Sequence, residues 1–148
     1  MRKFVLTVTL LLFIVSVNAQ SPVKWSYKAK KIADKHYEIR IEAKLDEGWH
    51  IYSQSTPDGG PVPTAISFSK NPLLTLEGGI KEVGKLEEHF EPLFGVKVKQ
   101  YSDKVEFVQT IKLKAAVKTN IRGHLEFMVC DDEKCLPPAK QTFSIPLK

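Results

Sequence analysis

The sequence has little of what builds a metal site or a membrane span. It contains only two cysteines, Cys130 and Cys135, and its four histidines are scattered. Two cysteines without a histidine at ligand spacing do not complete a four-ligand zinc site, so we expect no metal. No apolar run after residue 19 is long enough to cross a bilayer. No stretch of helical period is long enough to predict a helix, which excludes helical fold classes.

One apolar run lies at the amino terminus. A positive start, Arg2-Lys3, precedes an apolar stretch over residues 4–17, and Val17-Asn18-Ala19 is a small-residue cleavage site. This pattern is typical of a secretory signal peptide and is too short for a membrane span. We therefore expect residues 1–19 to be removed. Residues 20–148 then form one soluble domain in an oxidising compartment, where two cysteines pair.

The charge balance does not indicate a nucleic-acid partner. The formal charge of the whole sequence is +5 at pH 7, and it falls to +3 once Arg2 and Lys3 leave with the signal peptide. The lysines are spread along the solvent faces of the expected strands instead of forming a cluster. This distribution favours solvation and protection of sheet edges over a nucleic-acid patch.

Alternation of apolar and polar residues predicts an all-β fold. Extended segments are expected at residues 23–30, 37–45, 49–54, 64–69, 74–76, 96–101, 105–113, 125–130 and 141–147. Turn signals such as Asp46-Glu47-Gly48 separate them, and residues 87–95 are expected to form a loop. About eight short strands with regular turns point to a β-sandwich.

The two cysteines lie at the feet of a four-residue turn, Asp131 to Lys134. A strand that ends at Cys130 runs into this turn, and a rigid Pro137-Pro138 follows Cys135. Facing residues of a hairpin lie about 4.5–5.5 Å apart, which is close enough for a disulfide. The sequence therefore predicts that the two cysteines face each other and pair.

The pattern leaves open whether this disulfide is a structural crosslink or a reactive group. Crosslinks are common in exported proteins, although closing so short a loop contributes only about 2 kcal/mol. The acidic run Asp131-Asp132-Glu133 should disfavour a thiolate at Cys130, whereas Lys134 should favour one at Cys135. Such an asymmetry suits thiol–disulfide exchange, in which one sulfur is attacked and the other leaves.

Three segments of the chain resemble the N-terminal periplasmic domain of the thiol:disulfide interchange protein DsbD. They are the cysteine hairpin from Cys130 to Pro138, the strand Gly48-Trp49-His50-Ile51-Tyr52, and Phe94-Gly95 with the segment from Tyr101 to Val105. The resemblance covers roughly Val23 to Leu147. It implies an immunoglobulin-like β-sandwich with a redox-active cysteine hairpin.

The resemblance also implies a function and the roles of the two cysteines. Electrons would pass through the Cys130–Cys135 dithiol/disulfide from a thioredoxin-like donor to periplasmic thiol oxidoreductases, with no cofactor besides the disulfide. Cys135 resembles the cysteine that forms mixed disulfides with partners, and Cys130 resembles its internal resolving partner. The family's membrane and thioredoxin-like domains do not follow Lys148 in this sequence, so we expect donor and acceptor to be separate proteins. Whether the chain is itself an enzyme, as a protein-disulfide reductase component, stays open.

An aromatic residue covers the disulfide in the family that this chain resembles. Phe94 resembles this cap, and Phe90 is the second choice because the loop after Gly95 is one residue longer here. The residues expected to line the site are Tyr52, His50, Asp131 and Lys134.

The competing interpretation is a secreted binding module with a purely structural disulfide. The loop from Asp58 to Pro63 could carry the ligand site of such a protein. The reactivity of the disulfide separates the two classes. A crosslink resists mild reductant, whereas a relay exchanges with thioredoxin-like proteins.

Overall fold

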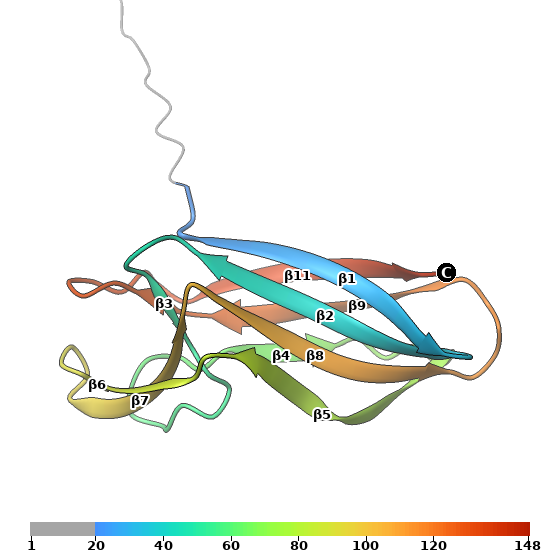
Figure 1. The fold of residues 1–148 in the computed structure, drawn as a ribbon, viewed down its shortest axis with the longest axis horizontal. Coiled ribbons are helices and arrows are strands. Elements are labelled where there is room, and N and C mark those ends of the chain that lie inside the picture. Colours follow the sequence, from blue (N-terminus) through green and yellow to red (C-terminus); the bar gives the residue numbers. More distant parts are fainter. Residues whose placement is uncertain (1–19) are drawn as a thin grey trace, which may run out of the picture.

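The computed structural model describes residues 20–148, in which every regular element is a strand (Figure 1). The strands are β1 Val23–Ala33, β2 His36–Leu45, β3 His50–Tyr52, β4 Ala65–Phe68, β5 Leu74–Gly84, β6 Glu87–Glu91, β7 Val96–Ser102, β8 Lys104–Leu113, β9 Thr119–Phe127, β10 Val129–Cys130 and β11 Ala139–Leu147. The all-β prediction is confirmed. The signal peptide predicted for residues 1–19 lies outside the described residues and stays a prediction.

Two sheets form the body of the sandwich. Their strand orders are β1-β2-β8-β5 and β11-β9-β4, and every pairing is antiparallel. Alternate residues of their strands point inward and share one apolar core, which includes Ile39, Ile41, Phe107, Ile111, Ile121, Leu125 and Ile145. Each such side chain stabilises the fold by about 1.5–3 kcal/mol when it is fully buried. The period-two pattern of the sequence therefore marks the core face, as predicted.

A third sheet, with strand order β10-β3-β7-β6, lies at one end of the sandwich (at the left in Figure 1). Its strand β10 arises where the chain changes sheets. The sequence predicts one continuous strand up to Cys130, but the strand breaks at Met128, between β9 and β10. β9 pairs with β11, whereas β10 pairs with β3 and sets Cys130 opposite His50. This change of sheet delivers the cysteine turn to the end of the molecule.

The expected loop at residues 87–95 is mostly strand, which corrects the prediction. β6 pairs with β7 through residues 87–91, and only residues 92–95 form the turn between them. Gly95 has a φ of 68°, a left-handed conformation that glycine adopts at little cost. β6 is an edge strand, so polar residues occur on both of its faces and the alternation that identifies a strand is lost.

Two structural absences hold for residues 20–148. No helix there is long and apolar enough to span a membrane. No group of three or more His, Cys, Asp or Glu side chains is arranged to hold a metal ion.

Candidate functional site

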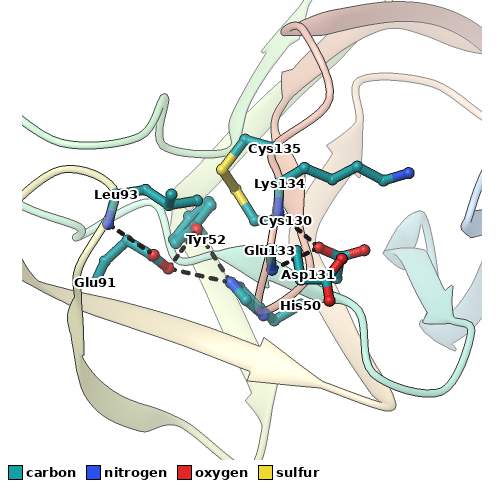
Figure 2. Close-up of a disulfide and its surroundings, with 9 residues drawn as sticks. All are labelled: His50, Tyr52, Glu91, Leu93, Cys130, Asp131, Glu133, Lys134 and Cys135. Carbon is teal, nitrogen blue, oxygen red and sulfur yellow. Dashed lines mark hydrogen bonds and ion pairs between the residues drawn. A yellow bond between two sulfur atoms is a disulfide. The ribbon is translucent and has the colours of Figure 1, made fainter.

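A disulfide joins Cys130 and Cys135 across the predicted turn (Figure 2). Their Cα atoms are 4.0 Å apart, and the two residues form an antiparallel bridge. Main-chain hydrogen bonds close the turn on both sides: the Asp131 amide donates to the Lys134 carbonyl at 2.9 Å, and the Leu136 amide donates to the Val129 carbonyl at 2.9 Å. The predicted pairing at the feet of the turn is confirmed.

Asp131 holds the shape of this turn. Its Oδ1 atom accepts hydrogen bonds from the amides of Glu133, at 2.9 Å, and Lys134, at 2.7 Å. These two bonds favour the ionised carboxylate and lower the pKa of Asp131. An aspartate that bonds the main chain two and three residues ahead is a common turn device. The structure therefore gives Asp131 a conformational role beside the disulfide.

The two sulfur-bearing residues differ in their surroundings. Cys130 is fully buried and clusters with Tyr52 and Val98. Cys135 is half-buried and packs against this cluster from outside. Because exchange requires an incoming thiolate to approach a sulfur in line with the disulfide, Cys135 is the accessible partner of the pair.

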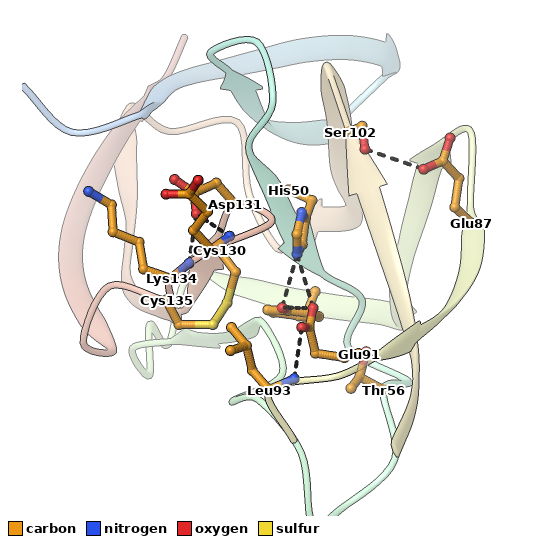
Figure 3. A network of polar contacts seen from close by, with 12 residues as sticks. His50, Thr56, Glu87, Glu91, Leu93, Ser102, Cys130, Asp131, Lys134 and Cys135 are labelled. Atoms are coloured by element: carbon orange, nitrogen blue, oxygen red, sulfur yellow. Dashed lines mark hydrogen bonds and ion pairs between the residues drawn. A yellow bond between two sulfur atoms is a disulfide. The ribbon is translucent and has the colours of Figure 1, made fainter. Parts of the chain in front are cut away.

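A buried polar network lies beside the disulfide (Figure 3). The Tyr52 hydroxyl donates to Oε2 of Glu91 at 3.2 Å, and Nε2 of His50 lies 3.1 Å from that hydroxyl and 3.5 Å from the same carboxylate oxygen. Exposed fractions are 6% for His50, 0% for Tyr52 and 3% for Glu91. β3 contributes the first two residues and the end of β6 contributes the third.

Burial sets the protonation of this network. It lowers the pKa of His50, and the attraction of Glu91 opposes that effect without cancelling it. Burial and the neighbouring Glu91 carboxylate together raise the pKa of Tyr52. Near neutral pH the phenol therefore keeps its proton and donates a hydrogen bond to Glu91, while the imidazole is uncharged.

The family described as "Thiol:disulfide interchange protein DsbD, N-terminal" matches residues 18–147 of this chain. The chain belongs to this family. No curated protein matches the chain.

Two solved structures are similar to this member of the DsbD N-terminal family. The N-terminal periplasmic domain of ScsB from Proteus mirabilis has a TM-score of 0.61 and 18% identity, and the match covers 90% of this chain and 49% of that chain. The reduced DsbD N-terminal domain from Neisseria meningitidis has a TM-score of 0.54 and 18% identity, and the match covers 82% of this chain and 83% of that chain. The chain thus spans about half of the ScsB structure. These likenesses confirm the predicted immunoglobulin-like sandwich.

The family resemblance predicted a cap from Phe94, with Phe90 as the second choice, and the structure places the two side chains differently. Phe90 sits on β6 between His89 and Glu91, so it faces away from the network, and its side chain is 55% exposed. Phe94 is half-buried in the turn, yet it is not among the described residues that pack on the cluster around Cys130. Shielding by Phe94 therefore stays a prediction, and Phe90 is on the wrong face for it.

The side chain of Leu93, which belongs to this turn, lies beside the disulfide, as Figures 2 and 3 both show. Its side chain is 51% exposed, and its amide donates to Oε1 of Glu91 at 3.4 Å. Sequence reasoning missed both Leu93 and Glu91, because the expected cap was aromatic and the expected loop was longer. The proline before Leu93 and the glycine that ends the turn are the local signals that could have located it.

Lys134 lies next to Cys135 in the chain but not at its sulfur. Its ammonium is 6.0 Å from the centroid of the Trp49 ring, and Figures 2 and 3 show it directed away from the disulfide. The predicted stabilisation of a Cys135 thiolate by Lys134 has no direct contact to support it in this disulfide form. The asymmetry of the pair instead rests on burial.

Proposed function

We propose that this chain is a periplasmic relay that exchanges electrons with partner proteins through the Cys130–Cys135 disulfide. Membership of the DsbD N-terminal family supports this function. The observation that carries the proposal is the unequal exposure of the two cysteines, with Cys130 at 0% and Cys135 half-buried at the end of the molecule. A crosslink across so short a turn contributes only about 2 kcal/mol and needs no such arrangement.

Reduction of the relay begins at the accessible sulfur. A thiolate of a thioredoxin-like donor attacks the Cys135 sulfur, the bond to Cys130 breaks, and Cys130 leaves with the electron pair and takes up a proton. The donor's second thiolate then attacks the sulfur of the donor's first cysteine in the mixed disulfide, and the Cys135 thiolate leaves. Two electrons have moved, the donor is now a disulfide, and both cysteines of the relay are reduced.

Delivery to an acceptor follows the same steps in reverse. The Cys135 thiolate attacks the disulfide of a periplasmic thiol oxidoreductase and forms a mixed disulfide with it. Cys130 is held nearby, since the two Cα atoms are 4.0 Å apart in the disulfide form. Its thiolate attacks the Cys135 sulfur, restores the internal disulfide and frees the reduced acceptor.

Reduction by a protein thiol tests this function. Residues 20–148 are incubated with a catalytic amount of reduced thioredoxin, thioredoxin reductase and NADPH, and new thiols are alkylated and counted by mass spectrometry. We expect the two thiols to appear together at a rate that depends on the thioredoxin concentration. A disulfide that resists thioredoxin in the folded protein would return the pair to the structural crosslink of a binding module.

A further inference from the structure

We propose that Glu91 is a positioning residue that fastens the turn of residues 92–95 over the disulfide, so that loss of its contacts admits an attacking thiol. This inference rests on the proposed relay function, because the accessibility of the disulfide matters most if the disulfide exchanges. It concerns a carboxylate that does not touch the reacting sulfurs and acts through Leu93.

Glu91 bonds to both sides of the site with different atoms. Its Oε2 atom accepts from the Tyr52 hydroxyl at 3.2 Å and lies 3.5 Å from Nε2 of His50, both on β3. Its Oε1 atom accepts from the Leu93 amide at 3.4 Å. Its main-chain carbonyl accepts from the amides of Phe94, at 3.2 Å, and Gly95, at 2.8 Å. Glu91 therefore links the turn of residues 92–95 to β3.

The turn itself does not require a carboxylate. The two main-chain bonds to the Glu91 carbonyl would form with any residue at this position. The side chain is only 4% exposed, and burying a carboxylate is costly unless hydrogen bonds compensate it. The Tyr52 hydroxyl and the Leu93 amide donate those hydrogen bonds. Both bonds are therefore kept as long as the charged carboxylate stays buried. This arrangement makes the carboxylate a fastener between β3 and the turn.

The position of Leu93 depends on its hydrogen bond to Glu91, because burial does little to hold this side chain in place. Its side chain lies beside the disulfide in Figures 2 and 3, yet it is 51% exposed and gains little from burial there. The hydrogen bond from its main-chain amide to Oε1 of Glu91 links Leu93 to the network. Releasing that bond lets the turn move without disrupting the apolar core.

The charges around the network give this fastener a pH dependence. His50 is faced by Glu91 and His89 from β6, by Tyr52 from its own strand, and by Asp131 and Asp132 from the cysteine turn. Burial lowers the pKa of His50 in the closed arrangement. Acid therefore favours an open arrangement in which water reaches the protonated imidazole.

The test compares the reduction rate of residues 20–148 by a water-soluble phosphine in wild type, Glu91→Gln and Glu88→Gln. Glu88 is the matched control, because it lies on β6, is exposed and faces away from the network. We expect Glu91→Gln to be reduced about tenfold faster near neutral pH, as expected from the loss of a charge-assisted hydrogen bond. Glu88→Gln should stay within about twofold of wild type.

Two further measurements separate fastening from a general loss of structure. The ratio of the Glu91→Gln rate to the wild-type rate should shrink on acidification, because acid opens the wild-type turn; taking a ratio cancels the ionisation of the phosphine. The double variant Glu91→Gln/Leu93→Ala should be reduced no faster than Leu93→Ala alone. If Glu91→Gln does not fold, Tyr52→Phe removes the hydroxyl that bonds the carboxylate and should also speed reduction.

Wild-type rates in the folded Glu91→Gln and Tyr52→Phe variants would overturn the inference, as would additive effects of Glu91→Gln and Leu93→Ala. Failure of this inference is distinguishable from failure of the relay. An unchanged phosphine rate together with reduction by thioredoxin would refute the fastener and leave the relay. A faster phosphine rate in a protein that resists thioredoxin would support the fastener and refute the relay.

Discussion

At the residue scale, the chemistry of the site depends on which side chains reach the disulfide. Cys130 is enclosed by Tyr52 and Val98, while Cys135 lies outside them and is half-buried. Leu93 lies beside the disulfide. Phe90 points to the face of β6 opposite to that of Glu91. The aliphatic side chain of Leu93 is thus expected to take part in shielding the pair.

Replacing Leu93 should expose the disulfide with little effect on stability. Leu93→Ala removes a side chain that is already 51% exposed, so we expect faster reduction by a small thiol and a change in unfolding free energy below about 1 kcal/mol. Reduction rates and urea unfolding measure both quantities. Phe90→Ala is the control and should keep the wild-type rate. If Phe94→Ala speeds reduction and Leu93→Ala does not, the aromatic side chain is the shield.

His50 should make stability depend on pH. Its pKa in the folded protein is lowered from the ordinary value of 6.5, chiefly by burial. The unfolded chain therefore binds more protons than the folded protein, and the stability present above pH 6.5 is lost as pH falls through the folded pKa. Urea unfolding at about pH 7.5 and about pH 5.5 should show a smaller loss for His50→Asn than for wild type. Equal losses would show that other groups cause the dependence.

At the scale of elements, the local parts of the site could be predicted and the parts set by pairing could not. The Cys130–Cys135 bridge follows from residues five apart in one turn, so spacing was sufficient. The break at Met128 and the pairing of β10 with β3 depend on packing between distant strands. The loop that contains Leu93 was predicted too long, because the polar edge strand β6 has no apolar alternation to mark it.

β9 also contains a position where close packing requires glycine. A Cβ atom at Gly123 would lie 2.2 Å from the Ser67 carbonyl oxygen on β4 and 2.6 Å from the Phe143 ring on β11. Gly123→Ala should therefore destabilise the protein by about 1–3 kcal/mol, measured by urea unfolding. Gly79→Ala is the control, since a Cβ atom there meets nothing within 4 Å. An unchanged unfolding midpoint for Gly123→Ala would mean that β4 and β11 move apart at low cost.

At the scale of the whole molecule, the sandwich serves to bring two turns together. The turn after β6 and the cysteine turn after β10 lie at the same end of the fold (Figure 1), although the four strands β7 to β10 separate them in sequence. The period-two pattern predicted the sandwich well, because it reports which face of each strand is buried. It could not predict that these two turns share one end of the molecule, since their placement depends on the pairing of distant strands in the sheet β10-β3-β7-β6.

Trapping with single-cysteine variants tests the central claim, that Cys135 exchanges with partners and Cys130 resolves. Cys130→Ser and Cys135→Ser are each mixed with a thioredoxin whose own resolving cysteine is replaced and whose remaining thiol is activated as a mixed disulfide with a small aromatic thiol. Covalent complexes are counted on non-reducing gels. The half-buried Cys135 should form a complex readily in Cys130→Ser, whereas the fully buried Cys130 should form little in Cys135→Ser. Equal trapping would contradict the assigned roles, and no trapping by either folded variant would contradict the relay itself.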